Sequence, residues 1–269
     1  MTSYSHVAAP SLALTARPSP GANEILSRLT DLYSIAQRSE HVFASPLGPF
    51  VHQGRSTHVP RFAFFGPHAS EVSWRLAILG GFDHHDLRSS AAVLGLLEDL
   101  ASNAADGFGL HLTFLPIVDA AGFFLGAPRR PLSSAHWARS DAPEIGLLER
   151  DARSSGYHGF VRVETAPADE EIITIAMRAP TGLLEGPDVE LITSDETQPF
   201  AVTFERSSVG QPPGCGPLSI ADDYTVGPFE LTLRVPAHWT PSRYQHAVRT
   251  ILHRFILRYR GFQGYAQHL

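Results

Sequence analysis

The sequence predicts an α/β fold: a single domain built on a mixed, mainly parallel central sheet flanked by helices. Two observations predict it. Segments with apolar residues at helical spacing alternate with short, strongly apolar segments that are typical of strands. Some strand segments, such as Leu110–Val118, are apolar without alternation, as expected where helices cover both faces of a sheet. We expect residues 1–20, which are rich in Ser, Ala and Pro, to form a loose leader and residues 21–269 to form the domain.

The first half of this domain contains two predicted helices and three predicted strands. In the first helix, Ile25, Leu29 and Leu32 share one face, and in the second helix Val93 and Leu97 repeat the same spacing. In chain order, the predicted elements are the helix Asn23–Arg38, the strands Arg61–Phe65 and Ser73–Gly80, the helix Ser89–Ala101 and the strand Leu110–Val118.

The second half begins with a helix whose start is marked by its residues. Asp141 can cap it, Pro143 is tolerated in its first turn, and Glu144 stands at the capping-box position. The final helix opens at Thr240-Pro241 and carries one apolar face. In chain order, the predicted elements are the helix Asp141–Arg153, the strands Gly159–Thr165, Glu171–Met177, Phe200–Glu205 and Phe229–Val235, and the helix Thr240–Tyr259.

Composition excludes several classes of protein. The net charge of −6 and the isoelectric point near 6.1 argue against a surface that follows nucleic-acid phosphates. All 21 basic residues are Arg, so a lysine Schiff base and a P-loop lysine are excluded. The one cysteine, Cys215, excludes a disulfide within the chain and a multi-cysteine metal site. Because it stands in a loop of Pro and Gly, we expect a packing thiol rather than a nucleophile.

No segment predicts insertion into a membrane or export. No apolar run reaches the ~18 residues that span a bilayer, and the N-terminal residues lack the basic and apolar regions of a signal peptide. The nucleophile elbow, the dinucleotide-binding turn and the Walker A motif are also missing. We therefore expect a cytoplasmic protein whose partner is a small molecule or a peptide, with no nucleic acid and no membrane. The oligomeric state is not predicted.

Ligand-type side chains gather in the turn Gly80–Asp86, between a predicted strand and a predicted helix. Ligand sites collect at such places in open α/β sheets. Asp83 and Asp86 are three residues apart and point to one place if the turn coils. The alternative is that Asp86 only caps the helix and the other polar residues are solvated. His84 and His85 are adjacent, so we expect them to point apart and to form a poor chelating pair.

The order of the elements carries a resemblance. A glycine-ended strand leads into the polar turn and a helix, and the next strand ends in the segment Pro116–Phe123. A Pro143-Glu144 helix start follows, and then the strands Phe160–Thr165 and Pro228–Pro236 precede the closing helix. From Arg61 to Tyr259 this order resembles the zinc carboxypeptidase superfamily, in the branch that includes succinylglutamate desuccinylase and aspartoacylase-like proteins. The resemblance implies that fold and a zinc-dependent hydrolytic site.

The resemblance also assigns site positions. In the family's Gly-x-His-x-x-Glu turn, Asp83 stands at the position of the zinc-binding His and Asp86 at the position of the zinc-binding Glu. The third zinc ligand, a His in the family, falls at Glu164. The general-base Glu falls at Arg234.

The family's second motif, Pro-x-x-Asn-Pro-Asp-Gly-Phe, is similar to Pro116–Phe123, with Asp119 at the usual Asn. Arg129 or Arg130 fills the substrate-binding arginine position. The Asp-Leu-Asn-Arg element, which handles a substrate carboxylate, has no clear match around Leu132–Trp137.

These replacements decide the functional interpretation. An all-oxygen set of two Asp and one Glu suits magnesium, calcium or manganese better than zinc, and an arginine cannot act as a base. We therefore predict a zinc-carboxypeptidase-like pseudoenzyme, non-catalytic or with a binding role, and without a cofactor. The alternative is a hydrolase of small amides, peptides or N-acyl amino acids. It would hold zinc or another divalent metal in a rebuilt carboxylate site or on His84 and His85. A third interpretation is an unrelated α/β protein with the same element order.

The residue at the base position leads to a sharper prediction. Three carboxylates in one partly buried pocket repel one another and need a positive charge. We predict that Arg234 pairs with at least one of Asp83, Asp86 and Glu164, in place of the metal. The alternative is that Arg234 points out of its strand into solvent.

Overall fold

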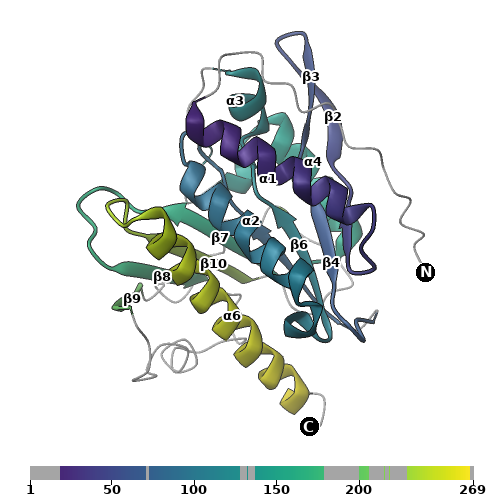
Figure 1. Cartoon of the computed structure of the whole chain (residues 1–269), viewed down its shortest axis with the longest axis vertical. Helices are drawn as coiled ribbons and strands as arrows, with labels where there is room; N and C mark the ends of the chain where they lie inside the picture. Colours follow the sequence, from purple (N-terminus) through teal and green to yellow (C-terminus); the bar gives the residue numbers. More distant parts are fainter. Residues whose placement is uncertain are drawn as a thin grey trace.

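An eight-stranded mixed sheet forms the centre of the protein, which confirms the predicted α/β class (Figure 1). The computed structural model describes residues 19–70, 73–127, 132, 137–178, 200–205, 215, 218 and 229–266, with side chains up to residue 257. From one edge to the other, the strands are β1 (Val42–Ala44), β4 (Phe62–Phe65), β6 (Leu110–Leu115), β5 (Trp74–Leu79), β7 (Gly159–Thr165), β10 (Phe229–Val235), β8 (Ile173–Arg178) and β9 (Val202–Glu205).

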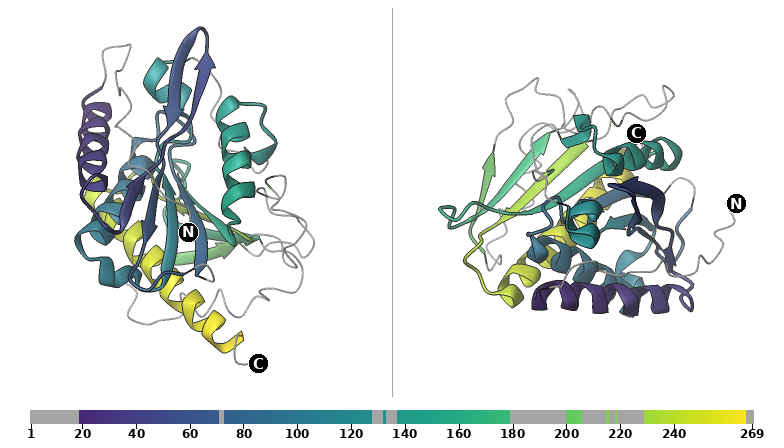
Figure 2. Two further views of the ribbon diagram at one scale, coloured as in Figure 1. Left: turned by 90° about the vertical axis from the view of Figure 1, so that its right-hand side faces the viewer. Right: turned by 90° about the horizontal axis from the view of Figure 1, so that it is seen from above.

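Helices cover both faces of this sheet. The helices α1 (Pro20–Ala36), α2 (Leu87–Ser102) and α6 (Pro241–Ala266) lie on one face, and α4 (Pro143–Ser155) lies on the other (Figure 2). None of the described helices is long and apolar enough to cross a membrane. The resulting three layers agree with the predicted arrangement of helices around a buried sheet.

The core fills the space on both sides of the sheet. Toward α6, the ring of Phe229 lies 5.8 Å from Phe255 and 5.8 Å from Trp74. Toward α4, the ring of Phe160 lies 5.6 Å from Tyr157. All five side chains are at most 3% exposed, so apolar burial on both faces stabilises the central strands.

The parallel strands β6, β5, β7 and β10 end at the same edge of the sheet. From β5 the chain passes through α2 to β6 on one side. It then passes through the short helix α3 (Ala120–Leu125) and α4, and enters β7 on the other side. This reversal creates a topological switch point at the carboxyl end of β5, where ligand sites form in open α/β sheets.

Several elements differ from the predicted ones. The strands β7 and β10 have the predicted bounds, but the sequence interpretation missed β1, α3 and a separate hairpin of β2 (Leu47–His52) and β3 (Arg55–Val59). Strand β6 ends before Pro116 rather than at Val118, because proline lacks the N–H that a central strand needs. Two short 3₁₀ helices, η1 (Ala104–Gly107) and η2 (Trp137–Arg139), complete the described elements.

The start of α4 also differs from its prediction. Its N-cap is Ala142, with no side-chain cap, so Asp141 does not cap the helix. Glu144 is fully buried, and its carboxylate accepts a hydrogen bond from the backbone amide of Ala121 at 2.9 Å. This acid therefore joins α4 to α3 instead of closing a capping box. Residues 1–18 of the predicted leader lie outside the described residues.

Candidate functional site

Two glycines allow the turn after β5 to be tight. Gly81 has a φ of +62°, and a Cβ atom there would lie 2.6 Å from Oγ of Ser90. Backbone hydrogen bonds join the turn to the segment after β6. The amide of Val118 donates to the carbonyl of Gly80 at 3.0 Å, and the amide of Asp119 donates to the carbonyl of Gly81 at 2.8 Å. The polar turn is therefore fixed beside the loop that carries Asp119.

A hollow of about 560 Å³ opens at the carboxyl ends of β5 and β7. Asp83, Asp86 and Glu164, the three acids that the resemblance assigned to zinc-ligand positions, all line it. The other lining residues are Phe82, His85, Leu87, Arg88, Val163, Thr165 and Ala237. The predicted acids thus border one space, and the contacts of each show what it can do there.

Asp86 is committed to contacts within the protein. Its carboxylate accepts hydrogen bonds from the backbone amide of Ser89 at 3.2 Å, and from the backbone amide and hydroxyl of Thr165 at 3.0 and 2.5 Å. It therefore caps α2, as the alternative in the sequence analysis stated, and also joins α2 to the end of β7. The hydroxyl of Tyr244 lies 3.3 Å from that of Thr165, and burial raises the pKa of Tyr244, with Asp86 adding to the rise.

Glu164 is paired with Arg162, a buried arginine two residues earlier on β7. Arg162 also donates through Nη1 to Oε1 of Glu230 at 2.9 Å, and the same oxygen accepts a hydrogen bond from the indole of Trp137 at 2.8 Å. The guanidinium group lies 4.9 Å from the ring centroid of Phe82, a distance at which a cation is attracted to an aromatic face. Arg162 therefore supplies the positive charge beside the acids of the hollow.

Arg234 does not supply this charge, and the prediction that it pairs with the three acids is wrong. Among the described residues its guanidinium pairs with Glu205 and lies 3.7 Å from Glu170. Arg234 is the register partner of Glu164 on β7, but Glu164 already has an arginine partner on its own strand. The side chain of Arg234 instead turns toward the acids near β8 and β9. Its side chain is 24% exposed, so it is partly solvated, as in the alternative, and is also held by these two acids.

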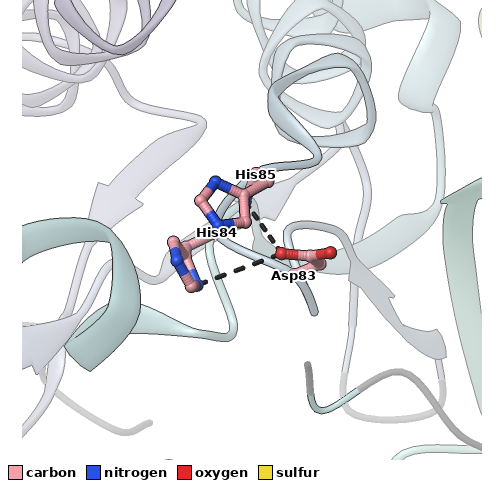
Figure 3. Close-up of side chains that lie close together, drawn as sticks. All are labelled: Asp83, His84 and His85. Carbon is pink, nitrogen blue, oxygen red and sulfur yellow. Dashed lines mark hydrogen bonds and ion pairs between the residues drawn. The ribbon is translucent and has the colours of Figure 1, made fainter. Parts of the chain in front are cut away.

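A second group of ligand-type side chains lies in the turn itself (Figure 3). Asp83, His84 and His85 each place one donor atom within 4.8 Å of the others. The two histidine rings lie 4.0 Å apart, so the expectation that adjacent histidines point apart is wrong here. The turn coils, because the carboxylate of Asp83 accepts from the amide of His85 and its carbonyl accepts from the amide of Asp86, both at 2.9 Å.

A buried carboxylate orients His84. Nδ1 of His84 lies 2.8 Å from Oδ2 of Asp119, which is fully buried and caps α3 through the amide of Gly122 at 3.0 Å. A carboxylate only accepts hydrogen bonds, so Nδ1 of His84 is the donor of this bond, and in the neutral ring the lone pair is on Nε2. A Cβ atom on Gly122 would lie 2.5 Å from Nδ1 of His84. The absence of a side chain at this position is therefore necessary for the pair.

The zinc ion that the family resemblance implies does not fit the three family positions. Asp86 accepts three hydrogen bonds, Glu164 is paired with Arg162, and the set offers no nitrogen ligand. At the position of the general base, Arg234 is a permanent cation. A metal at these positions would have to break contacts that stabilise the fold. The set of Asp83, His84 and His85 differs from these positions, because it offers imidazole nitrogens and lies within the turn after β5.

The other sequence-derived candidates are Arg129, Arg130 and Cys215. Arg129 and Arg130 lie outside the described residues. Cys215 is fully buried, and burial raises the pKa of its thiol, as suits the expected packing role. The sequence interpretation missed Arg162 and Glu230. Arg162 stands between Val161 and Val163, and a charged residue within so apolar a strand is a signal that could have identified it.

Comparison with solved structures shows a shared fold. A metallo-carboxypeptidase from Burkholderia cenocepacia superposes with a TM-score of 0.63 at 16% identity, over 88% of this chain and 69% of that one. A metallo-carboxypeptidase from Pseudomonas aeruginosa, in complex with (2-guanidinoethylmercapto)succinic acid, superposes with a TM-score of 0.57 at 17% identity, over 86% of this chain and 68% of that one. An aspartoacylase family protein from Mesorhizobium loti superposes with a TM-score of 0.52 at 10% identity, over 81% of this chain and 68% of that one.

No protein-family model matches the sequence, and the comparison with curated proteins found no match. The similarity to the solved structures therefore confirms the carboxypeptidase-like fold that the order of elements predicted.

Proposed function

We propose that this chain is a non-hydrolysing protein on a metallo-carboxypeptidase fold, and that its hollow binds a small molecule or a peptide. The observation that carries the proposal is the guanidinium group of Arg162, which pairs with Glu164 and Glu230 where the family resemblance places a metal ligand. A fixed cation there compensates the charge of Glu164 without offering the exchangeable water of a hydrolytic zinc site. Arg234, on β10, leaves the base position assigned by the resemblance without a proton acceptor.

The charge of the hollow indicates the class of ligand. Three carboxylates and one arginine, Arg88, line it. The guanidinium of Arg88 donates to the backbone carbonyls of Ala237 and Trp239, the latter at 2.7 Å, so it is directed to the protein. Asp83 is 30% exposed and accepts from the amide of His85. A ligand with an amine or guanidinium group would meet Asp83 at the open side of the hollow.

Hydrolysis assays test the first part of this proposal. We would incubate the protein, with added zinc, with peptides that have a free C-terminus and with N-acyl amino acids. We expect no turnover above that of an Asp83→Ala, Glu164→Ala double variant. Turnover that disappears with a chelator and returns with zinc would overturn the proposal in favour of a metal-dependent hydrolase.

Ligand titration tests the second part. Calorimetry with L-arginine amide as a cationic probe and succinate as an anionic probe separates the two charge classes. We expect L-arginine amide to bind and succinate not to bind. We expect Asp83→Asn to weaken the binding of L-arginine amide by at least about tenfold, because the ligand loses one charged partner. Preferential binding of succinate would contradict the assigned class of ligand.

A further inference from the structure

We propose that Asp83, His84 and His85 form a binding site for one borderline divalent cation of the zinc and cobalt class. This site is displaced from the three family positions, since only Asp83 belongs to both sets. The proposal goes beyond ligand binding in the hollow and does not require hydrolysis, because occupancy by the ion can be measured without turnover.

The donor atoms are close enough for one ion. They lie within 4.8 Å of one another, whereas two ligands of a single zinc ion, each at about 2.1 Å, are at most about 4.2 Å apart. The difference of about half an ångström is small for side chains in these positions. Asp83 is 30% exposed and His85 is exposed, so both can adjust around an ion. The rings of His84 and His85 already lie 4.0 Å apart.

The orientation of His84 is the second observation. A histidine that binds a metal through one nitrogen usually donates its other N–H to a carboxylate, which fixes the ring and makes the ligand more basic. His84 has this arrangement without any ion: its Nδ1 lies 2.8 Å from buried Asp119 and 3.9 Å from Oδ1 of Asp83, so an ion shared with Asp83 must be bound through Nε2. Asp119 is itself held by the amide of Gly122 at 3.0 Å. The protein therefore holds one ligand in place before the ion arrives.

The donor types select the class of ion. Two imidazoles and one carboxylate suit zinc, cobalt, nickel or copper, whereas magnesium and calcium favour sets made of oxygens only. Three protein ligands leave positions for water or for a further group. Because Asp83 and His85 also line the hollow, the ion and a cationic ligand of the hollow would compete for the carboxylate of Asp83.

Titration of the untagged protein with Co²⁺, followed by its visible absorption and by displacement with Zn²⁺, tests the site directly. We expect one ion per chain. We expect His84→Ala and His85→Ala each to weaken binding by about a hundredfold or more, and Asp119→Asn to weaken it by about 10- to 100-fold, as for other outer partners of metal ligands. His253→Ala, a change of an exposed histidine on α6, is the matched control and should leave binding unchanged.

Two further results separate the alternatives. His85 is exposed, so the His85→Ala variant should melt at the temperature of the unmodified protein when no ion is added, and a loss of binding then reports a lost ligand. If Glu164→Gln removes binding and His84→Ala does not, the ion occupies the family positions and the proposal is wrong. Absence of saturable Co²⁺ binding in the unmodified protein would equally overturn it, while leaving the non-hydrolytic function intact.

Discussion

Nη1 of Arg162 lies 2.9 Å from Oε1 of Glu230, and the two side chains are only 5% and 3% exposed. The register of β7 and β10 explains how they meet. Thr232 is the partner of Arg162, so Glu230 lies one diagonal step away on the same face, and Glu164 lies two residues further along β7. One guanidinium group therefore reaches both acids. A buried pair of this kind is sensitive to the loss of either partner, because the remaining charge is left in a medium that solvates it poorly.

We expect Arg162→Ala to lower the free energy of unfolding by about 3–5 kcal/mol, the usual effect of removing one partner of a buried pair. The matched control is Arg234→Ala. Arg234 is 24% exposed and pairs with Glu205, which is 52% exposed, so its loss should cost about 1 kcal/mol or less. Urea denaturation of both variants measures the difference. A larger loss for Arg234→Ala than for Arg162→Ala would show that Arg234, the residue predicted from the sequence, is the arginine that stabilises the fold.

Asp86 supports a second prediction on stability. Replacement by Ala removes the cap of α2 and leaves the amide and hydroxyl of Thr165 without their carboxylate partner. We expect a loss of about 2–3 kcal/mol in the free energy of unfolding, from one cap and one further unsatisfied donor. Asp83→Ala, three residues earlier and 30% exposed, should change it by no more than about 0.5 kcal/mol. Equal losses in the two variants would show that Asp86 is not a structural acid.

Two helical glycines give a third prediction. Ala at position 122 would place its Cβ atom 2.5 Å from Nδ1 of His84 and even closer to Oδ2 of Asp119, so the pair must separate. We expect Gly122→Ala to destabilise the protein by about 1–3 kcal/mol, the range for overpacking, and to weaken binding of Co²⁺ as Asp119→Asn does. A Cβ atom on Gly146, in α4, would meet no described atom within 4 Å, so Gly146→Ala should stabilise by about 0.5–1 kcal/mol. Thermal melting of the two variants should therefore shift in opposite directions.

The fold could be predicted from the sequence because its signals are local and repeated. The bounds of β7 and β10 follow from apolar runs that end at polar or proline residues. The hairpin of β2 and β3 lacks such signals. Its turn uses Gln53 and Gly54, both with positive φ, and glutamine is not a residue that predicts a left-handed turn. Helix α3 was missed because its six residues are too few to show a helical repeat of apolar positions.

The site was less predictable because its contacts depend on side chains from distant strands. The sequence placed three acids at one end of the sheet, and they line one hollow. It could not show which arginine would reach them, since Arg162 and Arg234 both stand on strands that end there. The choice depends on the acids of β9 and of the segment before β8, which attract Arg234 away. The contact of His84 with Asp119 likewise depends on backbone pairing between two loops.

His111, on β6, leads to a prediction on pH. Burial lowers its pKa to about 4, and the positive charges of Arg61 and Arg75, with His158, act in the same direction. Nε2 of His111 is buried with no hydrogen-bond partner in the described part of the chain, and its ring lies 4.2 Å from that of Phe65. The neutral form is therefore favoured in the folded protein.

The direction of the pH effect follows from the two states. Between pH 6.5 and about 4 the unfolded chain binds a proton at His111 that the folded chain does not bind. The stability contributed by this residue is thus complete above pH 6.5 and decreases as the pH falls toward 4. The pKa difference of about 2.5 corresponds to at most about 3.4 kcal/mol. His158, whose pKa burial also lowers, contributes in the same direction.

Replacement of His111 by Phe keeps an aromatic ring against Phe65 and removes the titrating group. The variant should therefore lose less stability than the unmodified protein when urea denaturation is compared at pH 7.5 and pH 5. By pH 5 most of the effect of His111 has developed, so the difference between the two proteins should reach about 2 kcal/mol. The same substitution at exposed His253 is the control and should leave the pH dependence unchanged. If the unmodified protein and His111→Phe lose equal stability, another group determines the acid sensitivity, and His111 is protonated in the folded state near its ordinary pKa.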